Sequence, residues 1–233
     1  MREALGTGGY GFASGILLPF QKLMLPVSAS RESRRVPVIM STRCSFGHEN
    51  VPTGRMLMIT YETERLILTP IQHGHEAELF KLNNDPLVRK ANFNDVPQTI
   101  ESVHEWLNRY SAQWRKNKFG VWLVYEKCNA GPMFIGRCGL QDYDDSTNPE
   151  FAYAFFEHAT GRGLGPEAAR FTITHAFRNS TKKKVIGFIA PGNERAERAA
   201  NKLGLRYIDD RLYDGNISKY YEMTREEYFS KHH

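Results

Sequence analysis

The sequence predicts an α+β fold in which helices flank one mixed, mostly antiparallel sheet. Several short segments have the length and the apolar pattern of strands, either alternating or continuously apolar. Other segments repeat their apolar residues at helical spacing and lie between these strands. Three of the expected strands follow one another without an intervening helix, which favours antiparallel neighbours.

One strand and then helical segments begin the folded part. Residues 63–70 alternate apolar and polar side chains and end at a proline, which indicates a strand. Residues 75–81 form a short expected helix, residues 85–88 begin another helical turn, and residues 90–97 are expected to be a polar loop. A long amphipathic helix capped by Thr99 follows, and its apolar stripe consists of Val103, Trp106, Leu107, Tyr110 and Trp114.

The middle of the chain is expected to supply three strands and a helix. Residues 120–125 and 134–140 pair as a hairpin, because residues 129–132 have turn chemistry. Residues 150–156 form the next strand. A helix then runs from a glycine-rich turn to Phe177.

The last part of the chain completes the sheet. Residues 184–189 form an apolar strand that is expected to be buried on both faces. A helix over residues 193–203 ends at Gly204, which is a suitable C-cap. Two late strands are expected around residues 207–208 and 220–223.

The composition is that of a soluble globular domain, with 41% hydrophobic and 24% charged residues. No apolar run is long enough to span a membrane, so we expect no membrane partner. The net charge of +5 comes mostly from the first 55 residues, so it does not argue for nucleic-acid binding. Cys44, Cys128 and Cys138 lack the spacing of a metal site, which predicts free thiols and no metal.

Residues 1–57 differ from the rest of the chain because they have no sustained hydrophobic period. Scattered Gly, Ser, Pro and Arg predict a disordered leader or extension, followed by one domain over residues 58–233. A cleaved organelle transit peptide is one alternative. A translation start assigned too far upstream is another, since Met56 and Met58 lie just before the first strand. We expect a cytoplasmic protein, or an organelle-targeted one if the leader is a transit peptide.

A glycine-rich turn, residues 161–165, separates the aromatic strand 150–156 from the next helix. Its glycines permit positive φ and close approach of a ligand. A helix that begins there directs free N–H groups and its positive dipole end at the turn, and Pro166 suits the first helical turn. This arrangement is typical of a phosphate-binding loop.

Several phosphate loops share this logic, and two of them do not fit. A nucleotide P-loop requires a Lys that does not follow Gly165, and the dinucleotide spacing Gly-x-Gly-x-x-Gly is absent from the turn. A formal dinucleotide match at residues 6–11 has neither a preceding strand nor a following helix. An ordinary strand-to-helix turn remains the alternative.

The turn resembles the pyrophosphate loop of the GNAT superfamily of N-acetyltransferases, whose pattern is Gln/Arg-x-x-Gly-x-Gly/Ala. The stretch 162–165, Arg-Gly-Leu-Gly, matches the second half, whereas Thr160 stands where Gln or Arg begins the motif. Residues 193–205 and 221–228 are similar to two further family patches, and the similarity is greatest to the RimJ/RimL-like branch. The resemblance extends from Thr63 to the end of the chain and implies the acyl-CoA N-acyltransferase (GNAT) fold.

The resemblance implies acetyl transfer from acetyl-CoA to an amine by direct attack in a ternary complex, without a metal. The backbone of the turn is then expected to bind the cofactor pyrophosphate, through Gly161, Arg162, Gly163, Leu164 and Gly165. The preceding strand is expected to pair with the pantetheine arm and to supply an N–H for the thioester oxygen, around Phe155, Phe156 and Glu157. Asn193 is expected to contact the same arm, or to cap a helix, or both.

Two residues are candidates for the proton transfers. Glu150 stands where RimL-like relatives often carry Glu, so it is the expected general base; a solvated carboxylate at the strand entry is the alternative. Many relatives use a Tyr on the last helix as the acid, but Ala200 occupies that position here. Tyr221, or its neighbour Tyr220, is the remaining candidate, with strand packing as the alternative role.

The acceptor is expected to be an amine, either of a small molecule or of a protein N-terminus. Residues 90–97 and 209–219 should line its side, but they carry both signs of charge and select no class. The protein is expected to be a monomer or a homodimer. A catalytically weak or inactive GNAT-like module that binds CoA or a protein partner is the second hypothesis, because Thr160, Ala196 and Ala200 depart from frequent family choices.

Overall fold

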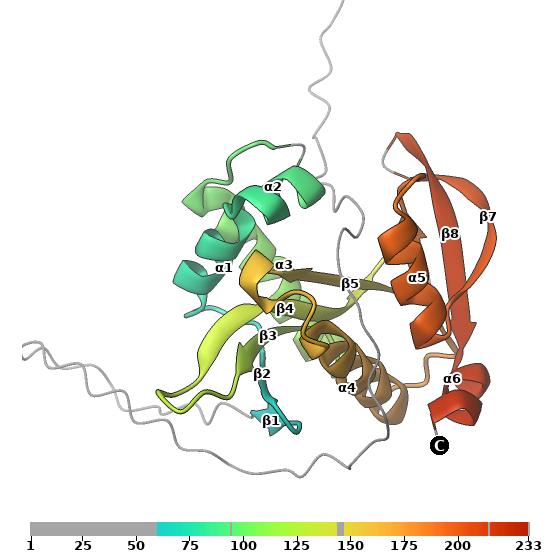
Figure 1. Cartoon of the computed structure of the whole chain (residues 1–233), viewed down its shortest axis with the longest axis horizontal. Helices are drawn as coiled ribbons and strands as arrows, with labels where there is room; N and C mark the ends of the chain where they lie inside the picture. The colour runs from blue at the N-terminus through green and yellow to red at the C-terminus, as the bar shows by residue number, and fades with distance from the viewer. Residues whose placement is uncertain (1–59, 94, 144–146, 214, 233) are drawn as a thin grey trace, which may run out of the picture.

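The computed structural model describes residues 60–93, 95–143, 147–213 and 215–232 (Figure 1). The leader expected over residues 1–57 lies outside the described residues. The described part contains one eight-stranded sheet with the order β1-β2-β3-β4-β5-β6-β8-β7. Every neighbouring pair is antiparallel except β5 and β6, which are parallel. The prediction of a mixed, mostly antiparallel sheet flanked by helices is therefore confirmed.

The predicted elements appear in the predicted order, and the structure adds β1 and α6, which were not predicted. The strands are β1 (Tyr61–Glu62), β2 (Leu66–Pro70), β3 (Val121–Glu126), β4 (Met133–Asp142), β5 (Pro149–Phe155), β6 (Lys184–Ile189), β7 (Arg206–Tyr213) and β8 (Asn216–Thr224). The helices are α1 (Glu76–Asn83), α2 (Pro86–Asn92), α3 (Ile100–Asn117), α4 (Leu164–Asn179), α5 (Glu194–Leu203) and α6 (Arg225–His232), with a short 3-10 helix η1 (Glu157–Ala159) before α4.

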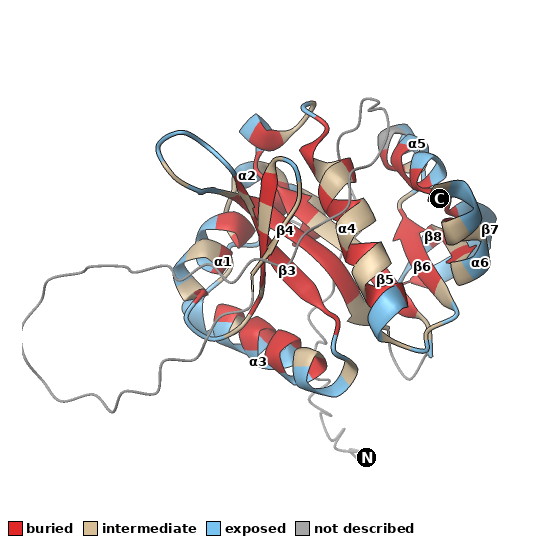
Figure 2. Cartoon of the chain, turned by 90° about the horizontal axis from the view of Figure 1, so that it is seen from below, coloured by how far each residue is buried: buried red, intermediate tan, exposed pale blue. Residues whose placement is uncertain are grey.

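Helices cover both faces of the sheet, and each face has its own hydrophobic core (Figures 1 and 2). We call the side that carries α4, α5 and α6 the α4 face, and the side that carries α1, α2 and α3 the α3 face. Strand β3 illustrates the alternation that produces them: Trp122 and Val124 pack on the α4 face, whereas Val121 and Leu123 pack on the α3 face. The central strands are therefore buried from both sides.

The helix caps bear out the sequence patterns. Thr99 Oγ1 accepts a hydrogen bond from the Ser102 N–H at 3.2 Å and begins α3, as predicted. Gly204 ends α5 with φ 101°, a conformation that favours glycine. Asn193 caps the start of α5, because its Oδ1 accepts from the Ala196 N–H at 3.1 Å.

Several boundaries were predicted incorrectly. The loop expected over residues 90–97 is shorter, because α2 continues to Asn92. The two late strands are much longer than expected; β7 is exposed along almost its whole length, so no apolar alternation marks it. Helix α6 was missed, although Thr224 and Glu227 form a capping box: the Glu227 N–H donates to Thr224 Oγ1 at 3.1 Å, and the Thr224 N–H donates to Glu227 Oε2 at 2.8 Å.

Candidate functional site

Strands β5 and β6 pair at one position only, Glu150 with Ile186, although β5 continues to Phe155 and β6 to Ile189. A cleft with an empty volume of about 320 Å³ opens beside this divergence. Its lining on the α4 face is almost wholly apolar and includes Phe151, Tyr153, Ile189, Ala196, Ala200 and Tyr221. The small side chains Ala196 and Ala200 on α5 leave room in it. The cleft suits a slender, largely apolar ligand with main-chain polar groups along one edge.

The end of β5 presents backbone donors to this divergence. The Phe156 N–H donates to the Ile135 carbonyl of β4 at 3.0 Å. Because successive N–H groups of a strand point to opposite sides, the Phe155 N–H points away from β4, toward β6. Of the three residues expected to serve the thioester, Phe155 therefore directs its N–H into the divergence, whereas Phe156 directs its N–H at β4.

Thr160 is the C-cap of the short helix η1. Its N–H and its Oγ1 both donate to the Glu157 carbonyl, at 2.9 and 2.7 Å. The Glu157 side chain is exposed. The departure from Gln or Arg at position 160 thus accompanies a tight turn between β5 and the glycines.

The glycine turn has the backbone conformation of an anion-binding site. Gly161 and Gly163 have φ of 80° and 78°, in the left-handed region that favours glycine. Gly163 is the N-cap of α4 and supplies no side-chain cap. Within the described part of the chain, no acceptor is bonded to the N–H groups of residues 161–165. These N–H groups and the helix dipole together favour a negatively charged ligand.

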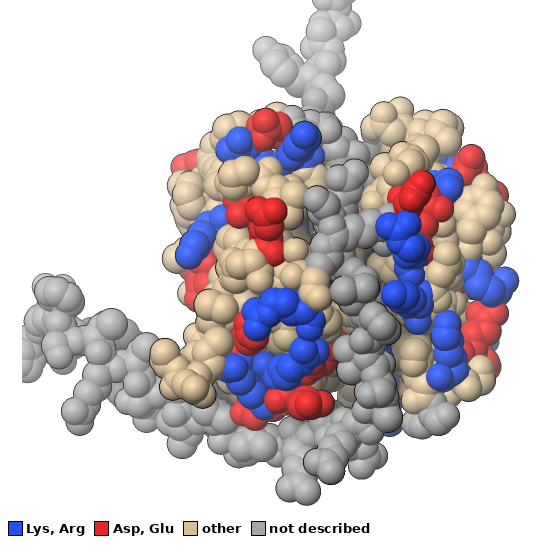
Figure 3. Space-filling view, in the orientation of Figure 1, with Lys and Arg blue, Asp and Glu red and all other residues tan. Residues whose placement is uncertain are grey.

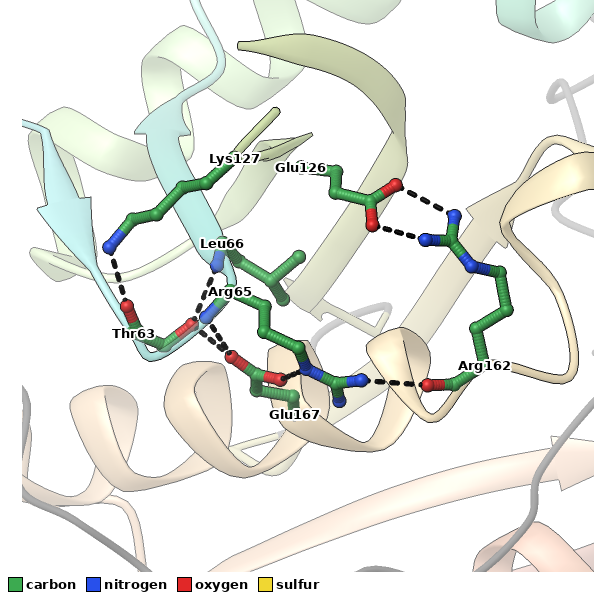
Figure 4. Close-up of polar contacts among 7 residues, drawn as sticks. All are labelled: Thr63, Arg65, Leu66, Glu126, Lys127, Arg162 and Glu167. Atoms are coloured by element: carbon green, nitrogen blue, oxygen red, sulfur yellow. Dashed lines mark hydrogen bonds and ion pairs between the residues drawn. The ribbon is translucent and has the colours of Figure 1, made fainter. Parts of the chain in front are cut away.

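A network of ion pairs holds the turn in place (Figure 4). The Arg162 guanidinium pairs with both carboxylate oxygens of Glu126 on β3, so the Arg162 side chain points toward β3. Arg65 Nη1 donates to the Arg162 carbonyl at 2.8 Å, and Arg65 Nε donates to Glu167 Oε2 at 2.8 Å. Glu167 also accepts from Thr63 Oγ1 at 2.5 Å. Arg162 is thus an anchor of the turn, and its main chain is the part that the turn presents.

The ion-pair network was not predicted from the sequence. Glu126, Glu167 and Arg65 come from three distant segments, and no local pattern relates them. In the view of Figure 3, side chains of both charge signs occur over the described surface. The mixed charges agree with a near-neutral folded part.

Glu150 is buried on the α3 face and is not the solvated carboxylate of the alternative interpretation. Only 5% of its surface is exposed. The Tyr213 hydroxyl lies 3.1 Å from each of its oxygens, and Gln141 Nε2 donates to Oε2 at 3.2 Å. Tyr213 is fixed in turn by stacking on Phe188, with ring centroids 4.1 Å apart. The carboxylate therefore has a defined orientation.

Tyr221 lies on the opposite face of the sheet. Glu150 pairs with Ile186, whereas Tyr221 pairs with the next residue of β6, Gly187. Because successive side chains face opposite sides, Glu150 and Tyr221 point to opposite faces. The Tyr221 hydroxyl donates to Glu197 Oε2 at 3.3 Å. Burial, with a further contribution from Glu197, raises the pKa of Tyr221 to about 12.

Tyr220 does not share this position. It packs on the α3 face against Phe188, with ring centroids 5.4 Å apart, and its hydroxyl donates to Glu222 at 3.3 Å. Of the two tyrosines left open by the sequence, Tyr221 is therefore the one that lines the cleft.

The described residues contain no group of three or more His, Cys, Asp or Glu that could hold a metal ion. No described helix is long and apolar enough to cross a membrane. Cys128 and Cys138 are free thiols, as expected, and burial raises the pKa of the Cys138 thiol to about 12. Cys44 lies outside the described residues.

Comparison with known proteins assigns the domain. A family model described as "Acetyltransferase (GNAT) domain" matches residues 65–206. A Bacillus subtilis protein named "Uncharacterized protein YkkB" is 30% identical over 150 residues, which cover 62% of this chain and 84% of that protein. The "FsC-acetyl coenzyme A-N(2)-transacetylase" of Aspergillus fumigatus is 27% identical over 190 residues, covering 72% of this chain and 77% of that protein.

Solved structures share the fold. A putative GNAT-family acetyltransferase from Bordetella pertussis has a TM-score of 0.61 and 24% identity, covering 70% of this chain and 98% of that one. The ribosomal-protein-S5-alanine acetyltransferase from Vibrio fischeri has a TM-score of 0.59 and 15% identity, covering 73% and 98%. At these identities the structural similarity establishes the fold.

Proposed function

Because the chain belongs to the GNAT acetyltransferase family, and is therefore an acyltransferase enzyme, we propose that it transfers the acetyl group of acetyl-CoA directly to an amine in a ternary complex. One observation carries the proposal. The N–H groups of the glycine turn have no acceptor among the described residues at the start of α4, and an apolar cleft opens where β5 and β6 diverge. A pyrophosphate and a pantetheine arm have the matching chemistry.

In the proposed complex, main-chain groups hold the donor. The N–H groups of residues 161–165 bind the pyrophosphate: Gly161 and Gly163 supply the left-handed conformation of the turn, and Arg162, Leu164 and Gly165 contribute their backbone. The pantetheine arm pairs with the β5 edge near Phe155 and Glu157, and contacts Asn193. The Phe155 N–H polarises the thioester carbonyl and stabilises the oxyanion, a role whose loss costs about 3 kcal/mol in the transition state.

The proposed chemistry uses both faces of the sheet. The acceptor amine gives its proton to Glu150, directly or through water, on the α3 face. The amine nitrogen then forms a bond to the acetyl carbon, and the carbon–sulfur bond breaks. The leaving thiolate lies near Tyr221 on the α4 face and takes a proton from Tyr221 or from water. The raised pKa of Tyr221 makes it a weak acid but keeps it protonated as a hydrogen-bond donor.

We further propose an assignment to the RimJ/RimL-like branch, with acceptors of two kinds. The Vibrio fischeri structure and a Vibrio cholerae structure of similar fold are named as ribosomal-protein acetyltransferases, which favours a protein N-terminus. The name of the Aspergillus fumigatus relative, an N(2)-transacetylase, favours an amine of a small molecule. We also propose that residues 58–233 form the acetyltransferase domain and that the protein is located in the cytoplasm.

Acetyl-CoA binding and thiol release test the proposal together. Saturation at about 100 times the dissociation constant should raise the free energy of unfolding by about 2.7 kcal/mol, measured by thermal or denaturant unfolding. Free CoA thiol should then appear when small amines or peptide N-termini are added. Binding without thiol release from any amine would favour a CoA-binding module, and the absence of both would refute the proposal.

A further inference from the structure

Arg137 is a buried charge with no acidic partner among the described residues. It lies on β4 with 3% of its surface exposed. Its Nη1 donates to the Tyr110 hydroxyl on α3, and its Nε is bonded to none of the described residues. No Asp or Glu of the described residues forms an ion pair with it. Because a guanidinium cannot lose its proton in a protein, such a buried charge is costly unless something balances it.

The described groups nearest Arg137 are aromatic rings and a second guanidinium, and the Glu150 carboxyl lies further along the same face of the sheet. Its guanidinium lies 5.6 Å from the Trp106 ring centroid, and that of Arg109 lies 4.0 Å from the same ring. No acidic residue of the described chain pairs with Arg109 either. Burial raises the pKa of Tyr110, so its hydroxyl stays neutral and does not balance the charge.

A small cavity adjoins the guanidinium on the α3 face. It is narrow and partly open to solvent, and its lining includes Tyr110, Arg137, Gln141 and Ala152. The strand register explains the space: between the Arg137–Ala154 and Gln141–Glu150 pairs lies the Gly139–Ala152 pair, which has little side-chain volume. The cavity therefore has a guanidinium at one end and, at the other, the Gln141 that holds the Glu150 carboxylate.

From this geometry we infer that Arg137 binds a carboxylate of the acceptor, so that the substrate is an amine that also carries a carboxylate, as a free amino acid does. This inference rests on the proposed function. Nη1 is occupied by Tyr110, which leaves the edge formed by Nε and Nη2 for a planar, bidentate partner. The acceptor amine then lies toward Glu150, on the same face of the sheet.

The inference separates acceptor classes that the proposed function leaves open. A polyamine would bring positive charge to two guanidinium groups and leave Arg137 unpaired. A protein N-terminus that begins with neutral residues has no carboxylate close to its amine. A small zwitterion satisfies Arg137 through its carboxylate and offers its amine, once deprotonated, to the thioester.

The test compares matched acceptors on the full-length enzyme. The common L-amino acids are assayed by thiol release beside their C-terminal amides, spermidine and a short peptide. At least one acid should exceed its own amide in kcat/KM by about 10- to 100-fold, mainly through KM, because the amide cannot make the charge-assisted pair. Equal or faster turnover of the amides, spermidine or the peptide overturns the inference and leaves the proposed acetyl transfer intact.

Variants then attribute the preference to one residue. Arg137→Gln should lower kcat/KM for the acid to that of the amide, while the amide rate and the KM for acetyl-CoA stay unchanged. Arg137→Lys keeps the charge without the fork and should restore part of the preference. Arg115→Gln removes an exposed positive charge from α3 and should change nothing. An acid preference that survives in Arg137→Gln overturns the inference.

A binding measurement tests the inference if Arg137→Gln does not fold or if the wild-type protein turns over none of these compounds. With CoA present, the preferred acids should raise the melting temperature of the wild-type protein, and their amides should not. If the wild-type protein turns over no amine, acetyl transfer is refuted as the function. If in addition no acid stabilises the protein more than its amide, the carboxylate site is refuted as well.

Discussion

The two faces of the sheet at β5 differ in the kind of group that they offer a ligand. On the α4 face the groups are main-chain N–H donors and apolar side chains, and the glycine turn is fixed by ion pairs behind it. On the α3 face they are buried charged side chains, Glu150 and Arg137, held by tyrosines and Gln141. Under the proposed function, the backbone groups of the α4 face bind the donor, which is the same in every reaction, and the side chains of the α3 face select the acceptor.

The largest effect is expected for Gly163→Val, which breaks the α4 face. A β-branched residue at φ 78° is strained by roughly 1–3 kcal/mol. If the backbone relaxes, at least two charge-assisted bonds to phosphate are lost, each worth about 1.5–3 kcal/mol. Acetyl-CoA affinity should therefore fall by about two to four orders of magnitude, measured by titration calorimetry, while circular dichroism shows the fold retained.

Two controls separate the turn's backbone from its side chains. Gly165→Ala places a methyl group 3.6 Å from the Phe155 ring, an ordinary contact, and should leave affinity nearly unchanged. Arg162→Gln removes only the pair with Glu126, and its half-exposed side chain limits the effect to a few-fold. Unchanged affinity in Gly163→Val would refute this interpretation of the turn.

The next effect is expected for Glu150→Gln, which breaks the α3 face. The amide keeps the size of the side chain and can still bond to Tyr213 and Gln141, but it cannot accept a proton from the amine. General base catalysis contributes about 10²- to 10⁴-fold, so kcat should fall by about 10²-fold or more. Acetyl-CoA affinity should not change, because the proposed donor site lies on the other face.

Glu222→Gln is the matched control for Glu150→Gln. Glu222 pairs with the same Ile186 from the opposite side of β6 and makes an ion pair with Lys184 at 2.7 Å. Its amide should keep the wild-type rate. A Glu150→Gln enzyme that retains full activity across the pH range would show that Glu150 is not the base.

Much of the fold was predictable because local patterns specify its elements. The stripe of α3, the Thr99 cap and the apolar run of β6 each depend on residues close in sequence. The exposed strand β7 was predicted too short because its side chains carry no burial pattern, and its pairing with β8 is decided by main-chain bonds. Helix α6 had a readable capping box that was overlooked.

The candidate site likewise has a part that could be predicted from the sequence and a part that could not. The glycine turn is contiguous, so its residues could be named from the sequence. The environment of Glu150 could not, because Tyr213 and Gln141 reach it from other strands. The partners of Arg162 and the isolation of Arg137 likewise depend on tertiary contacts between segments far apart. A single sequence gives no signal for such pairs.

The smallest of these effects is expected for Tyr221→Phe, which tests whether the α4 face contributes any acid. A phenol with a pKa of about 12 gives up its proton reluctantly, and thiols ordinarily have a pKa near 8.5, so protonation of the leaving thiolate gains little from it. We expect kcat to fall by only about ten-fold, through loss of a hydrogen bond, with no change in the pH profile below about pH 9.

The stability of the protein at alkaline pH supplies an independent measurement. The folded protein keeps the Tyr221 proton between about pH 10 and 12, where an unfolded tyrosine has lost it, so the free energy of unfolding falls as the pH rises through that window. Tyr221→Phe should remove this part of the alkaline destabilisation. A fall in kcat as large as that of Glu150→Gln would instead make Tyr221 an obligatory acid, and the two faces would then share the proton chemistry equally.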